Sequence, residues 1–161
     1  YFPGNINLKP FENLELEDFD KDFKLNFLGL VSILKFYKPR LNNGASLVFI
    51  STVASKLGMP FHSSVSAVKS AINGLTKSLA AEWAPLIRVN CISPSLFESK
   101  MSEKFYKSDK MIDRMNDRHP LKRTGKAEDI ASLINFLISD ESSWITGQNI
   151  SIDGGMSTIK K

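Results

Sequence analysis

Apolar residues along this chain form two alternating patterns. Three segments carry them at spacings of three and four, which predicts amphipathic helices. These segments are 18–37, 63–83 and 128–138. Short, continuously apolar runs alternate with the helices and predict strands covered on both faces. These runs are 47–51, 87–92 and 149–152. Strands that alternate with helices predict parallel βαβ units with right-handed crossovers, and therefore an α/β fold.

The first predicted helix is apolar on most of its sides. One stripe consists of Phe19, Phe23, Phe27, Leu30, Leu34 and Tyr37, and further apolar residues lie off it at Leu25, Leu28, Val31 and Ile33. A helix that is apolar nearly all round is expected to be buried on most sides. Either a second chain or another part of the same protein could provide that cover.

The remaining segments predict loops. Residues 52–62 contain Gly58 and Pro60, and a polar region is predicted to start at Pro94 and to continue to about Gly125, with one helix within 100–116. No repeat, linker or second domain is visible. We therefore expect residues 1–161 to form a single domain, or part of one.

Composition and charge exclude several classes of function. The 161 residues include 42% hydrophobic and 24% charged side chains, an ordinary globular mixture. The net charge is +4, but Lys and Arg are dispersed along the chain, so no basic stripe indicates nucleic-acid binding. No run reaches the roughly 18 apolar residues of a membrane-spanning helix, and no signal-peptide pattern is present.

The single cysteine, Cys91, lies inside the apolar run IRVNCIS. A lone buried cysteine is typical of a reducing compartment, so we expect a cytoplasmic protein. No set of Cys and His residues has the spacing of metal ligands, so no metal site is predicted.

Residues 51–76, STVASKLGMPFHSSVSAVKSAINGLT, contain the most informative spacing. Lys69 follows Val65 by one helical turn, and Thr52 stands 13 positions before Val65, at the end of an apolar strand. Together with APLIRVNCISPSLFESKM at 84–101 and SSWITGQNISIDGGMS at 142–157, this segment resembles the short-chain dehydrogenase/reductase family, particularly its 3-oxoacyl-carrier-protein reductase-like members. The resemblance spans about residues 10–157.

In that family the segment reads S–x(12)–Y–x(3)–K. The resemblance places Thr52 in the serine position, Val65 in the tyrosine position and Lys69 in the lysine position. Reduction of a carbonyl needs a proton on oxygen as well as a hydride on carbon. A tyrosine with pKa about 10 can supply that proton when a nearby ammonium lowers its pKa. Valine has no proton to give, so we expect an NAD(P)(H)-dependent oxidoreductase that is catalytically crippled.

Other residues could replace the missing tyrosine. His62, Ser63, Ser64 and Ser66 are close to Val65 in sequence, and Tyr37 and Tyr106 are phenols elsewhere. A histidine titrates in a useful pH range, although the position of His62 favours a helix-entry or substrate-loop residue. Tyr106 falls in the segment after Pro94, which covers the substrate in the family. We expect none of them to restore the proton donor.

The resemblance assigns further positions to the cofactor and to the lysine. Asn26 matches an asparagine that holds a water linked to the active-site lysine, and it could instead be satisfied by helix backbone. Lys69 also binds the nicotinamide ribose in the family. Pro94 and Ser95 stand where the family has Pro-Gly close to the nicotinamide, so the Ser95 side chain alters the fit. Phe97 and Ser99 are expected to join the cofactor contacts, and Ser99 could also be a helix N-cap.

Only about three strands are present, whereas the doubly wound sheet of the family has roughly seven. No glycine-rich phosphate turn of the form TGxxxGxG or GxGxxG occurs. We therefore expect the C-terminal part of a Rossmann-like doubly wound parallel sheet. The strand at 47–51 would lack its family neighbour and would present an open edge. NAD or NADP is the implied cofactor, and this chain alone is expected to bind its adenosine half poorly.

Family members associate through helices that correspond to 18–38 and 63–84. The resemblance therefore implies a homo-oligomer, a dimer or a tetramer, and a small-molecule ketone or secondary alcohol as substrate. The alternative is a non-catalytic binding or assembly subunit that pairs with an intact relative. A third reading, a decayed gene product without a selected function, would fit poor solubility.

Overall fold

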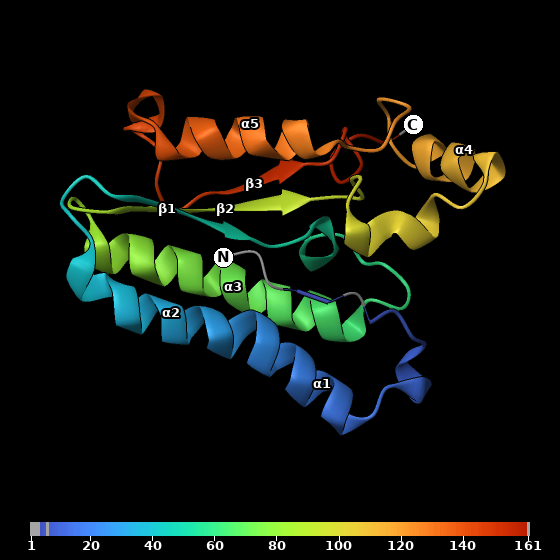
Figure 1. Cartoon of the computed structure of the whole chain (residues 1–161), viewed down its shortest axis with the longest axis horizontal. Coiled ribbons are helices and arrows are strands. Elements are labelled where there is room, and N and C mark those ends of the chain that lie inside the picture. Colours follow the sequence, from blue (N-terminus) through green and yellow to red (C-terminus); the bar gives the residue numbers. More distant parts are fainter. Residues whose placement is uncertain (1–3, 6, 161) are drawn as a thin grey trace.

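A three-stranded parallel sheet lies at the centre of the computed structural model, which describes residues 4–5 and 7–160. Its strands are β1 (Ser46–Ile50), β2 (Arg88–Pro94) and β3 (Asn149–Ile152), in the spatial order β1-β2-β3 (Figure 1). The register sets Phe49 opposite Cys91 and Cys91 opposite Asn149. Because β2 is central, six of its seven residues are buried. The predicted α/β fold with parallel strands is confirmed.

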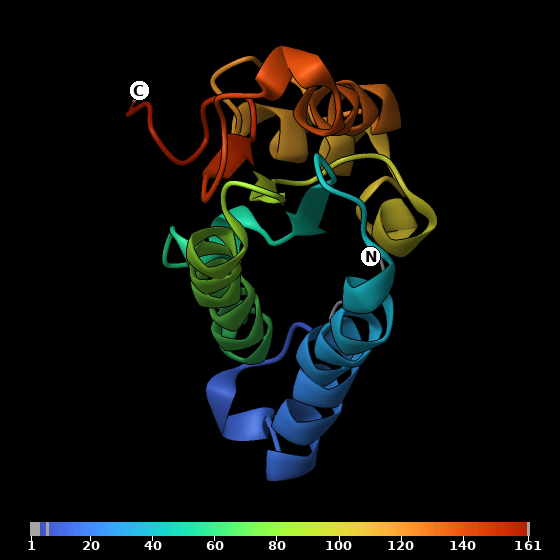
Figure 2. The ribbon, with the colours of Figure 1, turned by 90° about the vertical axis from the view of Figure 1, so that its left-hand side faces the viewer.

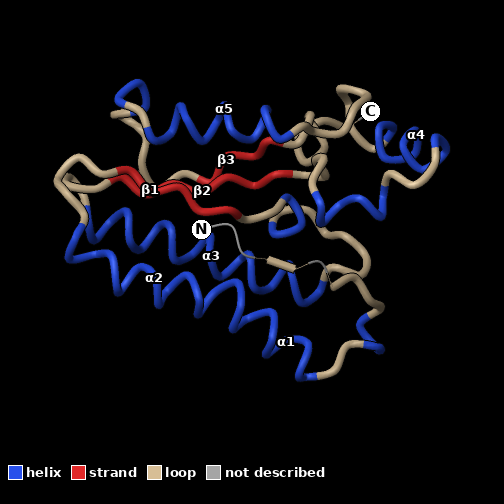
Figure 3. The backbone as a smooth tube through the Cα atoms, in the orientation of Figure 1, coloured by secondary structure: helices blue, strands red, loops and turns tan. Residues whose placement is uncertain are grey.

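Helices cover both faces of this sheet (Figures 1 and 2). One face carries α3 (Ser63–Trp83) and, beyond it, a long helix made of α1 (Leu16–Phe23), a π-helical segment (Lys24–Leu28) and α2 (Gly29–Tyr37). The other face carries α5 (Ala127–Ile138). The helix α4 (Asp109–Asp117) lies beyond the carboxyl ends of the strands, as the secondary-structure colouring of Figure 3 shows. Short 3₁₀ helices occupy Phe11–Asn13, Lys38–Arg40, Val53–Ser55, Lys100–Phe105 and Asp140–Ser142.

Two apolar cores form on the two faces of β2, because successive strand residues point to opposite sides. On the α3 side the core is Leu30, Phe49, Ile72, Ala80, Ile87, Val89 and Cys91. On the α5 side it is Ile92, Ile130 and Leu137. The burial of Cys91 agrees with its position in the apolar run.

The sequence patterns located most elements closely. The helix predicted at 63–83 has those bounds, and the predicted strands differ from the observed ones by no more than two residues at either end. Pro94 was expected to start a loop, but it is the last residue of β2 and is buried. Pairing with Ile152 of β3 extends the strand to this point, and a proline is tolerated at a strand end where no N–H is needed.

The expectation that the first helix is buried on most sides is wrong for this chain by itself. Leu30 is buried, and Phe27 and Leu34 pack against the same core. Several apolar side chains on other faces are exposed: Phe23, Leu25, Leu28, Ile33, Phe36 and Tyr37. A single helix can bury only the stripe that meets its neighbour, so the rest of this apolar surface is available to something outside the described residues.

The first strand lies at an edge of the sheet, as expected. Among the described residues, β1 pairs with β2 alone, so its other edge offers unpaired backbone groups. No helix in the described part of the chain is long and apolar enough to cross a membrane.

Candidate active site

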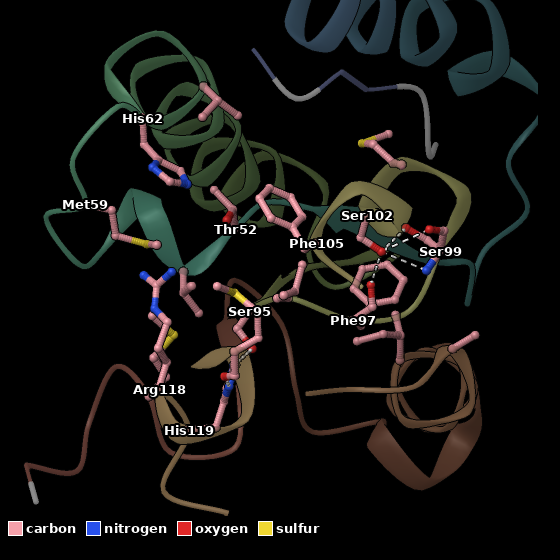
Figure 4. Close-up of a pocket in the computed structure, with 18 of the residues that line it drawn as sticks. Thr52, Met59, His62, Ser95, Phe97, Ser99, Ser102, Phe105, Arg118 and His119 are labelled. Atoms are coloured by element: carbon pink, nitrogen blue, oxygen red, sulfur yellow. Dashed lines mark hydrogen bonds between the residues drawn. The ribbon is translucent and has the colours of Figure 1, made fainter. Parts of the chain in front are cut away.

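A cavity of about 620 Å³ opens at the carboxyl ends of the strands (Figure 4). The loops after β1 and β2, the first turn of α3, the 3₁₀ helix at Lys100–Phe105, the end of α4 and one side of α5 enclose it. In open parallel sheets, ligands bind at this edge because the loops that follow the strands meet there. Its lining is predominantly apolar, as in most small-molecule sites.

Thr52 and Val65 both line the cavity, as the motif predicts. Thr52 follows β1, and its Oγ1 accepts a hydrogen bond from the backbone N of Ala54 at 3.3 Å, which caps the 3₁₀ helix there. No described residue accepts the Thr52 hydroxyl proton, so it remains available to a ligand. Val65 is in the first turn of α3 and presents only methyl groups to the cavity.

Lys69 does not line the cavity. Its Nζ donates to the carbonyl oxygen of Ile50, at the end of β1, at 3.1 Å. Burial lowers the pKa of the Lys69 ammonium below its usual value, and the nearby Cys91 opposes this by a smaller amount. Burial also raises the pKa of the Cys91 thiol to about 11. The thiol is therefore neutral near pH 7, and burial decides the direction for Lys69.

Asn26 lies in the π-helical segment and is buried away from the cavity wall. Its Nδ2 donates to the backbone O of Asp22 at 2.9 Å and to Oδ1 of Asn5 at 3.1 Å. Its Oδ1 is buried and accepts no hydrogen bond from the described residues. Buried acceptors of this kind are commonly satisfied by an ordered water.

A buried carboxylate joins this asparagine to the start of α3. Asp22 accepts from Oγ of Ser64 at 2.6 Å and from Nδ2 of Asn5. Ser64 precedes Val65, so the contact fixes the turn of α3 that faces the cavity. Neither Asp22 nor Asn5 was singled out by sequence reasoning, because their partners are distant in sequence.

Ser95 also lines the cavity, and its hydroxyl forms a hydrogen-bonded pair with His119. Its Oγ lies 2.9 Å from Nε2 of His119, and Nδ1 of the same ring lies 2.8 Å from the backbone O of Met115. Because a carbonyl oxygen only accepts, Nδ1 of His119 carries a hydrogen, and in the neutral form of the ring Nε2 then accepts from Ser95. His119 is buried and has no sequence signal, since it lies in a polar segment without periodicity.

Phe97 lines the cavity, and an isolated parallel β-bridge pairs it with Gly125. Backbone bonds run from Gly125 N to Leu96 O and from Glu98 N to Gly125 O, both 3.0 Å. Ser99 also lines the cavity and stands at the N-cap of the next 3₁₀ helix, where its backbone N donates to Oγ of Ser102. The N-cap reading of Ser99 is therefore confirmed, and its contact with a cofactor stays a prediction. Pro94 does not reach the wall.

Most candidate replacements for the tyrosine lie outside the cavity. Only His62 lines it; its Nδ1 is 2.7 Å from the backbone O of Pro60. Ser64 is engaged with Asp22, and Ser66 donates to the backbone O of Ala54 at 2.6 Å. Ser63, Tyr37 and Tyr106 are absent from the wall. The cavity also includes residues that the motif did not indicate: Met59, Met101, Phe105, Arg118 and His119.

No group of three or more His, Cys, Asp or Glu side chains in the described ranges could hold a metal ion. The chemistry that this cavity offers therefore comes from hydroxyl, imidazole and cationic groups on an apolar wall.

Comparison with known proteins places this chain in a family. The family model described as enoyl-(acyl carrier protein) reductase matches residues 3–157. A tropinone reductase homolog of Arabidopsis thaliana is 35% identical over 96% of this chain and 63% of its own length. The 3-oxoacyl-[acyl-carrier-protein] reductase FabG of Thermotoga maritima is 38% identical over 87% of this chain and 57% of its own length.

Solved structures agree. A short-chain dehydrogenase/reductase from Brucella melitensis superposes with a TM-score of 0.91 at 32% identity, over 97% of this chain and 63% of that one. A gluconate 5-dehydrogenase from Burkholderia cenocepacia, in complex with NADP and tartrate, gives 0.87 at 25% identity, over 98% and 63%. The chain belongs to the short-chain dehydrogenase/reductase family, whose members are NAD(P)-dependent oxidoreductases. It spans less than two thirds of the length of these relatives.

Proposed function

We propose that this chain carries the nicotinamide-proximal and substrate-binding part of a short-chain oxidoreductase site for a small ketone or secondary alcohol, and that the site is catalytically crippled. One observation supports the proposal that the site is crippled: Val65 lies in the cavity wall one helical turn before Lys69 and offers no proton. No tyrosine among the described residues lines the cavity.

The remaining groups can still orient a substrate. The Thr52 hydroxyl proton is uncommitted and faces the cavity, so it can donate to a carbonyl oxygen. Lys69 contributes positive charge behind the wall, although its ammonium is held by Ile50. NAD(P)H supplies the hydride when it is bound. We propose that no residue of the cavity wall delivers the proton that the oxygen needs when the carbonyl is reduced.

The residues expected to face the nicotinamide fit that group in part. Ser95, Phe97 and Ser99 line one cavity, and its volume can hold a ring and a small substrate. The Ser95 hydroxyl is turned to His119, so it does not compete for the carboxamide. A fluorescence titration of the chain with NADH and with NADPH tests this part. Saturable binding of either is expected to be weak, and no binding at millimolar concentration would refute a cofactor role for this chain.

Substitution of Val65 tests the crippled site. Val65→Tyr adds the phenol, and Val65→Phe adds the same ring without the hydroxyl. We expect NAD(P)H-dependent ketone reduction to be absent from the unmodified chain and from Val65→Phe, and to emerge only in Val65→Tyr. Turnover by the unmodified chain that disappears in Lys69→Ala would contradict the proposal.

A second candidate, a non-catalytic assembly subunit, is favoured by the surface of α1 and α2. Phe36 is 58% exposed and Leu28 is 43% exposed on a helix that is apolar on several sides. The exposed apolar residues of α1 and α2 also support a homo-oligomer, which the family resemblance would build through this helix and α3. Size-exclusion chromatography with light scattering should show a dimer or a tetramer, and Phe36→Glu should shift it toward the monomer. A stable monomer at all concentrations would count against both assemblies.

A further inference from the structure

The cavity has an unbalanced charge. Its wall is mostly apolar, and the two side chains of fixed charge that line it, Lys100 and Arg118, are both cationic. No Asp or Glu of the described residues lines it. Both residues are also exposed to solvent, so a ligand with an apolar body in the cavity and an anionic group beside one of these cations would match the lining.

Arg118 is the cation best suited to hold that group. It follows α4 directly, and its guanidinium forms no hydrogen bond or ion pair with any described residue. The nearby Arg123 and Lys122 are instead paired with Asp129 and Asp117, at 2.7 and 2.9 Å. Figure 4 shows the Arg118 side chain extending from its turn toward Met59 and His62, on the Thr52 side of the cavity. All five N–H donors of Arg118 are therefore left for solvent or a ligand.

We propose that the ligand of this cavity is an apolar carboxylic acid that bears a ketone or a secondary alcohol, with its carboxylate paired to Arg118. The planar guanidinium fork matches the two oxygens of a carboxylate, whereas the Lys100 ammonium acts as a point charge. Thr52 lies on the same wall and is free to hold the second oxygen function. The inference rests on the proposed function for its assignment of this cavity as the substrate site.

A carboxylate fits better than a phosphate monoester. A phosphate monoester carries up to about two negative charges at pH 7, so it would need both Lys100 and Arg118, whereas a carboxylate needs only Arg118. The cavity wall is mainly apolar, and one of its two histidines, His119, is already committed to Ser95 and Met115. The Arg118 guanidinium by itself can therefore compensate a group of single charge.

Calorimetric titration of the chain with octanoate, octanamide and octyl phosphate tests the proposal without cofactor. Octanoate should bind about tenfold more tightly than octanamide, the scale of one charge-assisted pair, and more tightly than octyl phosphate. Arg118→Gln should abolish the preference for octanoate over octanamide. Arg114→Gln is the matched control, because Arg114 lies on α4 outside the cavity wall, and it should keep the preference.

Three results would overturn the proposal: equal binding of octanoate and octanamide, tighter binding of octyl phosphate, or a preference that survives Arg118→Gln and is lost in Lys100→Gln. Because these titrations contain no NAD(P)H, a negative result would refute the carboxylate proposal without refuting the proposed oxidoreductase function. Octanoate preference through Arg118 without any NADH or NADPH binding would refute the oxidoreductase role and leave a carboxylate-binding cavity.

Discussion

The hydroxyl of Ser95 lies 2.9 Å from Nε2 of His119, and this pair ties the end of β2 to the segment after α4. Both residues line the cavity, and the imidazole is held on its other side by the backbone of Met115. The side chain at position 95, which was expected to alter the fit of a nicotinamide, is thus drawn into a contact with the protein itself.

Replacement of Ser95 by Ala should lower the free energy of unfolding by about 1–2 kcal/mol, because the buried Nε2 of His119 loses its donor. Urea unfolding monitored by circular dichroism measures the change. Ser70→Ala is the control: Ser70 is exposed and donates to its own helix, so a loss below about 0.5 kcal/mol is expected there. Equal losses in the two variants would show that the pair contributes nothing specific.

Asp22→Ala should destabilise the protein by about 2–4 kcal/mol, because Ser64 and Asn5 both lose their acceptor in a buried position. Asp20→Ala removes an exposed carboxylate from the same helix, paired with Lys24, and should cost less than about 1 kcal/mol. Thermal unfolding of both variants separates the two cases. A loss no larger for Asp22 than for Asp20 would refute the network.

The Cys91 thiol should resist labelling in the folded protein at pH 7, because it is buried and its pKa is raised from 9.0 to about 11. Since the folded pKa is the higher one, the protonated thiol stabilises the fold below pH 9, and that contribution is lost as the pH rises from 9 to about 11. Stability in Cys91→Ala should fall less over this interval. Rapid native labelling at pH 7, as fast as in urea, would contradict the assignment.

Two glycines should respond to alanine with opposite signs. At Gly125 a Cβ would stand 3.0 Å from Cβ of Phe97, so Gly125→Ala should push Phe97 and cost about 1–3 kcal/mol. At Gly74, inside α3, a Cβ meets nothing within 4 Å, and Gly74→Ala should stabilise the helix by about 0.5–1 kcal/mol. Denaturant midpoints give both values. A neutral Gly125→Ala would mean that Phe97 yields without cost.

The local spacing of apolar residues was sufficient to predict most helices and strands. The bounds of α3 follow from its periodic apolar residues, and β2 follows from its unbroken apolar run, because helix and strand each impose one period on the residues they bury. The expected absence of a proton donor also comes from local sequence, since Val65 and Lys69 are one turn apart on a single helix. By contrast, Pro94 was assigned to a loop because its strand depends on pairing with β3, which lies far along the chain.

From the sequence alone one can predict the α/β class, the parallel sheet with an open edge at β1 and the family resemblance, and one can see that a valine stands one turn before Lys69. Which side chains share the cavity depends on the tertiary structure. His119 meets Ser95 across 24 positions and Asp22 meets Ser64 across 42, and Arg118 reaches the cavity from the end of α4. Such contacts join residues that no local period relates, because they depend on how separate elements pack. The same reason explains why α2, apolar in sequence, is partly exposed here: a pattern shows that a face is apolar, but only packing shows what covers it.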